Sequence, residues 1–140
     1  MRFWDSSAVV PLLLEQPRSD QARTLLEEDV EVMIWWGTPM ECGSAFARPR
    51  REGLLSEVAE TESGRQLARL RATWYEMTPS DQLRALALRL LRVHPISAAD
   101  ALQLAAAMEW AGTPASGTFV TFDERLASAA VREGFTVHGP

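Results

Sequence analysis

Lysine is absent from this sequence of 140 residues, and all 14 of its Lys and Arg side chains are arginines. A phosphate-binding loop of the Walker A type requires a lysine that reaches the phosphates, and a Schiff-base enzyme requires a lysine as its nucleophile. The sequence therefore excludes both classes. The arginines have planar guanidinium groups, which bind phosphate through paired hydrogen bonds.

Cysteine and long apolar runs are also scarce. Cys42 is the one cysteine, so the chain forms no internal disulfide and a reducing compartment is the default. The carboxylate of Asp5 leaves no signal-peptide core at the N-terminus, and no apolar run approaches the roughly 20 residues that span a membrane. We expect a soluble, cytoplasmic protein without a membrane partner, folded as one domain over residues 1–140.

Charge is distributed unevenly along the chain. The formal net charge of -5 argues weakly against a nucleic-acid partner. Residues 48–92, however, contain nine arginines and six acidic residues, whereas the rest of the chain contains five arginines and thirteen acidic residues. This division is compatible with a metal-dependent nuclease, in which the acidic part binds cations and the basic part binds phosphate.

Short apolar segments alternate with longer segments of helical periodicity. Strands are predicted at residues 2–4, 30–35, 73–77, 117–121 and 135–138, the last at an edge of the sheet. Helices are predicted at residues 6–14, 19–28, 38–50, 54–71, 79–93, 97–111 and 124–133. We expect Pro11 to kink the first helix and Gly134 to follow the end of the last one. This alternation indicates an α/β domain with a mainly parallel sheet.

Three carboxylates occupy positions where such a sheet binds ligands. Asp5 and Asp123 come directly after predicted strands, and Glu41 lies in the first turn of a helix that follows another strand. In a doubly wound sheet these positions lie at the carboxyl edge of the strands. Clustered carboxylates repel one another unless a cation is present, and Mg²⁺ or Mn²⁺ suits ligation by oxygen alone. The pattern therefore suggests a metal site.

The same acids also fit ordinary helix starts. Asp5 can cap the helix that follows it, and three segments match capping boxes, namely Thr38–Glu41, Ser97–Asp100 and Thr121–Glu124. Asp100 follows a predicted helix rather than an evident strand, so spacing alone does not place it with the other three acids. Taken one at a time, each acid is explained more simply by capping.

Four motifs occur in order along the chain: Phe3–Ala8, Met40–Ala45, Ile96–Ala107 and Val120–Ala127. Their order and spacing resemble the PIN-domain nucleases, and in particular the VapC toxins of bacterial toxin–antitoxin pairs, over the whole chain. The resemblance implies a three-layer α/β/α sandwich. It also implies one acidic pocket in which Asp5, Glu41, Asp100 and Asp123 bind Mg²⁺ or Mn²⁺.

The resemblance further implies an activity and partners. Ser6 and Thr121 would match the small hydroxyl residues that support the pocket. The expected activity is metal-dependent hydrolysis of RNA, with transfer RNA or ribosomal RNA as the substrate. A homodimer and an antitoxin that blocks the site are also implied. Related toxins often have a histidine at the position of Gln103, and this chain departs from that pattern.

Three arginines follow the predicted Glu41 helix, namely Arg48, Arg50 and Arg51. One interpretation is that they bind RNA phosphates, which would make affinity depend on salt. The other is that they only complement the negative end of a helix dipole. Neither His94 nor His138 is placed well enough by the sequence to be a good candidate for a catalytic base.

Other functions fit parts of the pattern. A response-regulator receiver domain is also α/β with acids near its strand ends, but it typically needs a lysine in its site. An inactive PIN-like binding module would be expected to lack one of the pocket acids, and all four are present. A PIN nuclease of RNA processing that has no antitoxin remains open.

Overall fold

The computed structural model describes residues 1–112 and 115–140 of the chain. Its strands are β1 (Arg2–Trp4), β2 (Val32–Trp35), β3 (Tyr75–Met77), β4 (Thr118–Val120) and β5 (Thr136–His138). Its helices are α1 (Ser6–Val9), the 3₁₀ turn η1 (Val10–Leu12), α2 (Ser19–Glu28), α3 (Thr38–Arg51), α4 (Glu57–Arg71), α5 (Asp81–Val93), α6 (Ala98–Ala111) and α7 (Glu124–Arg132).

The five strands run parallel in one sheet, in the order β3-β2-β1-β4-β5. The chain begins at the centre with β1, adds β2 and β3 on one side, and then adds β4 and β5 on the other. The direction of winding therefore reverses between β1 and β4. Trp4 at the end of β1 lies opposite Val120 at the end of β4. In open α/β sheets, the crevice beyond the strand ends at such a reversal is where ligands bind.

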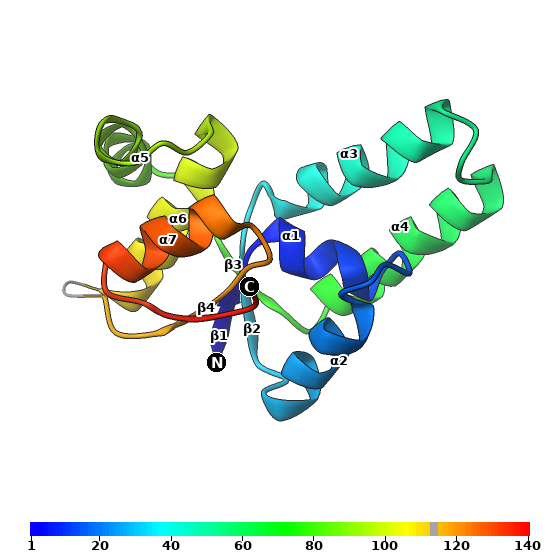
Figure 1. Ribbon diagram of the computed structural model, residues 1–140, viewed down its shortest axis with the longest axis horizontal. Coiled ribbons are helices and arrows are strands. Elements are labelled where there is room, and N and C mark those ends of the chain that lie inside the picture. The colour runs from blue at the N-terminus through cyan, green and yellow to red at the C-terminus, as the bar shows by residue number, and fades with distance from the viewer. Residues whose placement is uncertain (113–114) are drawn as a thin grey trace.

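Helices cover both faces of the sheet, which gives three layers (Figure 1). One core lies between the sheet and α5, α6 and α7, and it contains Phe3, Leu104 and Phe119. The second core lies on the opposite face, against α1 to α4, and it contains Trp4 and Ile34. Phe3 and Trp4 belong to different cores because successive strand residues point to opposite faces. The predicted α/β/α fold with a parallel sheet is confirmed.

The first helix differs from its prediction. It is not continuous over residues 6–14, because α1 ends at Val9 and the chain continues as η1, which contains Pro11. Proline has no N–H to donate within an α-helix and its ring crowds the preceding turn. The expected change of geometry at Pro11 is confirmed, and its form is a tightening into a 3₁₀ turn.

Several other elements begin later in the chain than predicted, by one to three residues. The helix predicted at residues 54–71 begins at Glu57, because the side chain of Ser56 accepts a hydrogen bond from the backbone N–H of Ala59 and caps it. The strand predicted from residue 30 begins at Val32. Gly134 follows the end of α7 with φ of 103°, as expected. Among the described residues, no helix is both long and apolar enough to cross a membrane.

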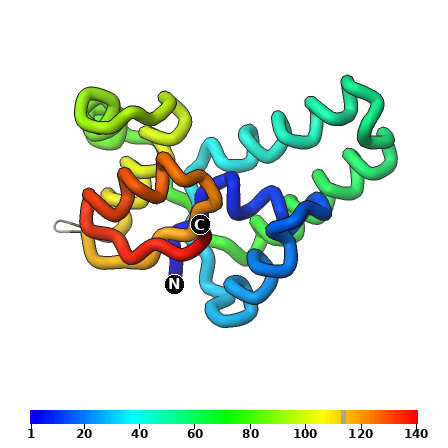
Figure 2. The backbone as a smooth tube through the Cα atoms, viewed as in Figure 1, coloured from blue at the N-terminus to red at the C-terminus, as the bar shows by residue number. Residues whose placement is uncertain are grey.

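Helices α3 and α4 pack against each other as a hairpin that projects away from the sheet (Figure 2). The turn between them is exposed at Glu52, Gly53 and Leu54. Gly53 has φ of 73°, a conformation that suits glycine. The base of the hairpin lies beside α1, so the first turn of α3 is close to the carboxyl end of β1.

Replacement of Leu104 by alanine tests the core beneath α6. Leu104 is fully buried between α6 and the sheet, so Leu104→Ala should lower the free energy of unfolding by about 2–5 kcal/mol. Leu88 lies on α5 and is 59% exposed, and Leu88→Ala is the matched control, expected within about 0.5 kcal/mol of the parent protein. Urea unfolding followed by circular dichroism measures both. Equal losses in the two variants would contradict the assignment of this core.

Candidate active site

Asp5 lies directly beyond β1, and its side chain is almost completely buried, with 2% of the residue exposed. Its Oδ2 atom accepts hydrogen bonds from the backbone N–H of Ser7 at 3.1 Å and from the hydroxyl of Thr121 at 3.0 Å. The Ser7 hydroxyl donates to the same oxygen. Oδ1 has only a contact of 3.4 Å with the Ser6 hydroxyl among the described residues. One oxygen of Asp5 is thus used by the fold and the other is available.

Burial raises the pKa of Asp5 from 3.8 to about 6. This value already includes the hydrogen bonds from Ser7 and Thr121, which lower the pKa, and the charge of Glu41, which raises it. Within the described residues, no basic side chain forms an ion pair with Asp5. A buried carboxylate without a cationic partner is costly to ionise, and this site therefore favours a cation.

Glu41 lies in the first turn of α3, and both of its carboxylate oxygens accept hydrogen bonds. The Ser6 hydroxyl donates to Oε2 at 2.7 Å, and the amide Nε2 of Gln103 donates to Oε1 at 2.9 Å. Burial raises the pKa of Glu41, and the charge of Asp100 raises it further, although the two hydrogen bonds act in the opposite direction. Asp100 is therefore close enough for its charge to affect Glu41.

Asp100 and Asp123 each use one oxygen to cap a helix. Oδ2 of Asp100 accepts from the backbone N–H of Ser97 at 3.2 Å and from the Ser97 hydroxyl at 2.7 Å, which completes the predicted capping box. Oδ1 of Asp123 accepts from the backbone N–H of Leu126 at 2.8 Å. The other oxygen of each carboxylate receives no hydrogen bond from the described residues. As at Asp5, capping leaves one oxygen available.

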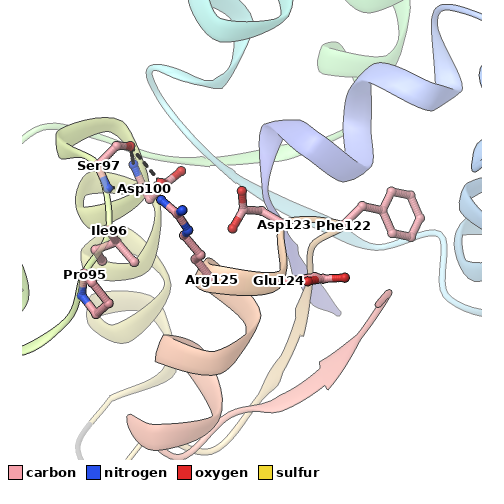
Figure 3. Close-up of a pocket in the computed structure, with 8 residues that line it drawn as sticks. All are labelled: Pro95, Ile96, Ser97, Asp100, Phe122, Asp123, Glu124 and Arg125. Atoms are coloured by element: carbon pink, nitrogen blue, oxygen red, sulfur yellow. Dashed lines mark hydrogen bonds between the residues drawn. The ribbon is translucent and has the colours of Figure 1, made fainter.

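A cleft of about 700 Å³ brings Asp100 and Asp123 together. In Figure 3 the carboxylate of Asp123 points toward α6, which carries Ser97 and Asp100, and Phe122 points the other way. Arg125 extends from the first turn of α7 toward Asp100. Within the described residues Arg125 forms no ion pair, so this cleft contains carboxylates and a guanidinium group that is not engaged by them.

Short polar links connect Asp5, Glu41 and Asp123 across the end of the sheet, and Asp100 shares a cleft with Asp123. Ser6 bridges Asp5 and Glu41, with the contacts given above. The Thr121 hydroxyl donates to Asp5 and accepts from the backbone N–H of Asp123 at 3.1 Å. The structure thus gathers the four predicted acids around the β1–β4 crevice. It does not draw three or more His, Cys, Asp or Glu side chains of the described residues into a ready-made metal cage.

The donor set of this crevice fits a hard divalent cation. The groups that face it are carboxylate and hydroxyl oxygens, which Mg²⁺ and Mn²⁺ prefer. Burial raises the pKa values of Asp5 and Glu41, and the charges of Glu41 and Asp100, respectively, raise them as well. A cation would relieve both effects. Asp5, Asp100 and Asp123 have an oxygen free to bind it, and Glu41 lies beside them.

The three arginines predicted to bind RNA occupy different surroundings. Arg48 lines a second cleft, of about 530 Å³, together with Ser6 and Glu41. Arg50 forms ion pairs of 3.5 Å and 3.7 Å with two glutamates of α4. Arg51 is exposed near the turn of the hairpin and lines neither cleft described here. Only Arg48 thus lies next to the acids.

Two of the predicted capping boxes are wrong. Gly37, not Thr38, is the N-cap of α3, because the segment Thr38–Pro39 already lies within the helix. The Thr38 hydroxyl instead bonds to Gln103. The N-cap of α7 is Asp123 itself rather than Thr121, since β4 and the chain beyond it hold Thr121 against Asp5. Both threonines are thereby directed to other side chains of the site.

Sequence reasoning missed three polar residues of this region. Gln103 contacts Glu41, Ser7 contacts Asp5, and Arg125 lines the first cleft. A signal existed for Gln103, a long polar side chain within the nearly apolar segment of α6. Ser7 lies two residues after Asp5, a spacing at which a side chain commonly bonds to a capping residue.

Other singled-out residues lie away from this chemistry. The ring of His94 is buried and bonds to Glu133 at 2.7 Å, near the end of α7. Burial raises the pKa of the Cys42 thiol to about 12, and the charges of Glu41 and Asp5 add to the effect. Cys42 is therefore a packed core residue and not a thiolate nucleophile. Trp35 is buried, whereas Trp36 is exposed.

Comparisons with known proteins agree with this fold. The family described as PIN domain matches residues 2–132. The crystal structure of Mycobacterium tuberculosis VapC20, described as a Sarcin-Ricin loop cleaving toxin, has a TM-score of 0.71 at 21% identity and covers 100% of both chains. No curated protein matches the sequence.

Two further solved structures are similar over most of the chain. The structure of FitAcB from Neisseria gonorrhoeae has a TM-score of 0.70 at 18% identity, covering 100% of this chain and 98% of the other. A toxin–antitoxin complex from Klebsiella pneumoniae has a TM-score of 0.65 at 15% identity, covering 91% of each chain. At these identities the similarity establishes a shared fold.

The buried charge of Asp5 should be visible in the pH dependence of stability without metal. The folded pKa of about 6 is above the ordinary value of 3.8. The folded state therefore binds the proton more tightly, and the stability that it gains from doing so is complete below about pH 4 and lost as the pH rises through 6. The difference between the folded and the ordinary pKa corresponds to a loss of about 3 kcal/mol in the free energy of unfolding.

Asp5→Asn cannot ionise, so its free energy of unfolding relative to the parent protein should increase by about 2–3 kcal/mol between pH 4 and pH 8 in EDTA. Urea denaturation at a series of pH values measures this difference. Ser128→Ala, at an exposed position of α7 without an ionisable group, is the control and should show a constant difference. A flat profile for Asp5→Asn would show that Asp5 is not held in a buried, cation-free setting.

Proposed function

Since this chain belongs to the PIN-domain family, we propose that it is a Mg²⁺- or Mn²⁺-dependent endoribonuclease and the toxin of a toxin–antitoxin pair. The observation that carries the proposal is the arrangement of Asp5, Asp100 and Asp123 around the β1–β4 crevice, each with one carboxylate oxygen held by the fold and one left available. Glu41 lies beside them and is held by neutral donors.

The residues of the site have different roles. Asp5, Asp100 and Asp123 bind the cation, with Glu41 as a further ligand, directly or through water. Ser6 and Thr121 fix the orientations of the carboxylates through the hydrogen bonds described above. When bound, the divalent cation supplies positive charge that lowers the pKa of water and offsets the charge that develops on the phosphate. With that chemistry available, the site needs no histidine base, and His94 is engaged with Glu133.

Two clefts flank the carboxylates and offer a path for the RNA backbone. Arg125 lines the cleft with Asp100 and Asp123, and Arg48 lines the cleft with Ser6 and Glu41. An RNA strand that crosses the acids would have a phosphate near each arginine, on either side of the bond to be cut. Guanidinium groups bind phosphates without regard to sequence, so these arginines would position the strand.

Substrate and partners follow from the proteins that share the fold. VapC20 is described as cleaving the Sarcin-Ricin loop, and we propose a structured RNA, ribosomal or transfer RNA, for this chain as well. A similar structure from Klebsiella pneumoniae is described as a toxin–antitoxin complex. We therefore propose a homodimer with a cognate antitoxin that covers the acidic crevice. The presence of all four acids argues against an inactive binding module.

Asp100→Asn should reduce Mg²⁺-dependent RNA cleavage by at least 100-fold, because the amide keeps the shape of the side chain but removes the charge that binds the cation. Cleavage of total RNA, resolved by gel and mapped at the cut ends, measures the loss. Asp81→Asn, at an exposed acid on α5, is the matched control and should retain full activity. Parent-level cleavage by a folded Asp100→Asn protein would overturn the assignment.

Arg48→Ala and Arg125→Ala should each weaken RNA binding, and each should reduce the slope of log Kd against log salt by about one unit. Filter binding with a catalytically inactive Asp100→Asn background separates binding from cleavage. Arg50→Ala is the control, since Arg50 is paired with α4 and lines neither cleft. A slope that is the same in all three variants would remove the proposed path.

A further inference from the structure

Gln103 is an exception on α6. The helix is apolar around most of its circumference, and Gln103 is fully buried within it. Burial of an amide costs free energy unless its donors and acceptor are satisfied. A leucine or alanine at this position would pack without any need for hydrogen-bond partners. The contacts of the Gln103 amide should therefore explain why a glutamine is found here.

The contacts of Gln103 lead to Glu41. Its Nε2 donates to Oε1 of Glu41 at 2.9 Å and to the Thr38 hydroxyl at 3.1 Å. The Thr38 hydroxyl is within 3.4 Å of the Gln103 carbonyl oxygen as well. Thr38 is itself fully buried, one turn before Glu41 on α3. The amide nitrogen of Gln103 thus donates to two separate acceptors, the hydroxyl of Thr38 and one oxygen of Glu41.

We propose that Gln103 is a positioning residue for the cation, acting through Glu41; this inference rests on the proposed metal-dependent function. Gln103 and Ser6 together hold both oxygens of Glu41, from two different helices. The carboxylate is thereby locked in one orientation before any cation arrives. Residues that orient metal ligands in this way commonly change metal affinity by about 10- to 100-fold when they are replaced.

The chemistry of an amide suits this position. An arginine or lysine would hold the carboxylate equally well, but its positive charge would compete with the cation for Glu41. A neutral amide donates a hydrogen bond to the ionised form and leaves the negative charge available. Removal of the donor would leave only the Ser6 hydroxyl on Glu41, so one of its oxygens would no longer be held in place.

A merely structural role for Gln103 makes a different prediction from a role through Glu41. If Gln103 only fills space beneath the crevice, its replacement changes metal affinity by the same factor whether or not Glu41 carries a charge. If it acts through Glu41, the two substitutions are coupled, and the effect of one largely disappears in the presence of the other. A double-mutant cycle in metal affinity distinguishes these cases.

The experiment measures Mn²⁺ binding by isothermal titration calorimetry, without RNA, for Gln103→Met, Glu41→Gln and the double variant. Methionine matches the length of glutamine and suits a buried helix position. Thr38→Val is the matched control, because it removes a buried hydrogen bond of Gln103 but leaves the bond to Glu41. Urea unfolding of each variant records stability separately. Gln103→Asn keeps the amide but shortens its reach, and provides a second variant if Gln103→Met does not fold.

We expect Gln103→Met to weaken Mn²⁺ binding at least 10-fold in the parent protein and less than 2-fold in the Glu41→Gln background. Thr38→Val should lower stability and change Mn²⁺ affinity less than 3-fold. An unchanged affinity in Gln103→Met, or an equal loss in both backgrounds, would overturn the inference while the proposed function stands. A parent protein that binds no Mn²⁺ would overturn the proposed function, and the inference with it.

Discussion

The carboxylate of Asp5 is buried where the winding of the sheet reverses, and much of the surrounding polar structure follows from that burial. An ionised group in this position is costly unless hydrogen bonds or a cation stabilise it. Ser7 and Thr121 supply hydrogen bonds to one oxygen. No basic side chain of the described chain pairs with the other. The fold thus stabilises one oxygen of the carboxylate and leaves the other oxygen available to a ligand.

Capping and metal binding turned out to be compatible interpretations of the same acids. The sequence presented them as alternatives, because each acid fits a helix start. In the structure Asp5, Asp100 and Asp123 do cap helices, with one oxygen each. A carboxylate has two oxygens with several acceptor sites, and the cap fixes the direction of the second oxygen. Helix starts at the carboxyl edge of a parallel sheet therefore aim spare oxygens into one crevice.

Local patterns predicted the fold class, most elements and the positions of Asp5 and Asp123, because periodicity and strand ends are properties of short segments. They did not place Asp100, which reaches the crevice from α6, a helix that packs against β2 and β3, and this position is a matter of tertiary packing. Its position was expected only from a family resemblance, and it now lies with Asp123 in one cleft. Nor did they predict the contact between Gln103 and Glu41, which are 62 residues apart.

The α3–α4 hairpin projects from the sheet, so a change in its angle would move residues along α3 by different amounts. Glu41 lies near its base, and Arg48 lies seven residues further along α3, roughly 10 Å at the usual rise of a helix. A small tilt of the hairpin about its base would therefore move Arg48 much farther than Glu41. The distance between Arg48 and Asp5, which lies at the end of β1, therefore depends on the angle of the hairpin. In the proposed ribonuclease, that angle would set the spacing between the phosphate bound by Arg48 and the acidic crevice.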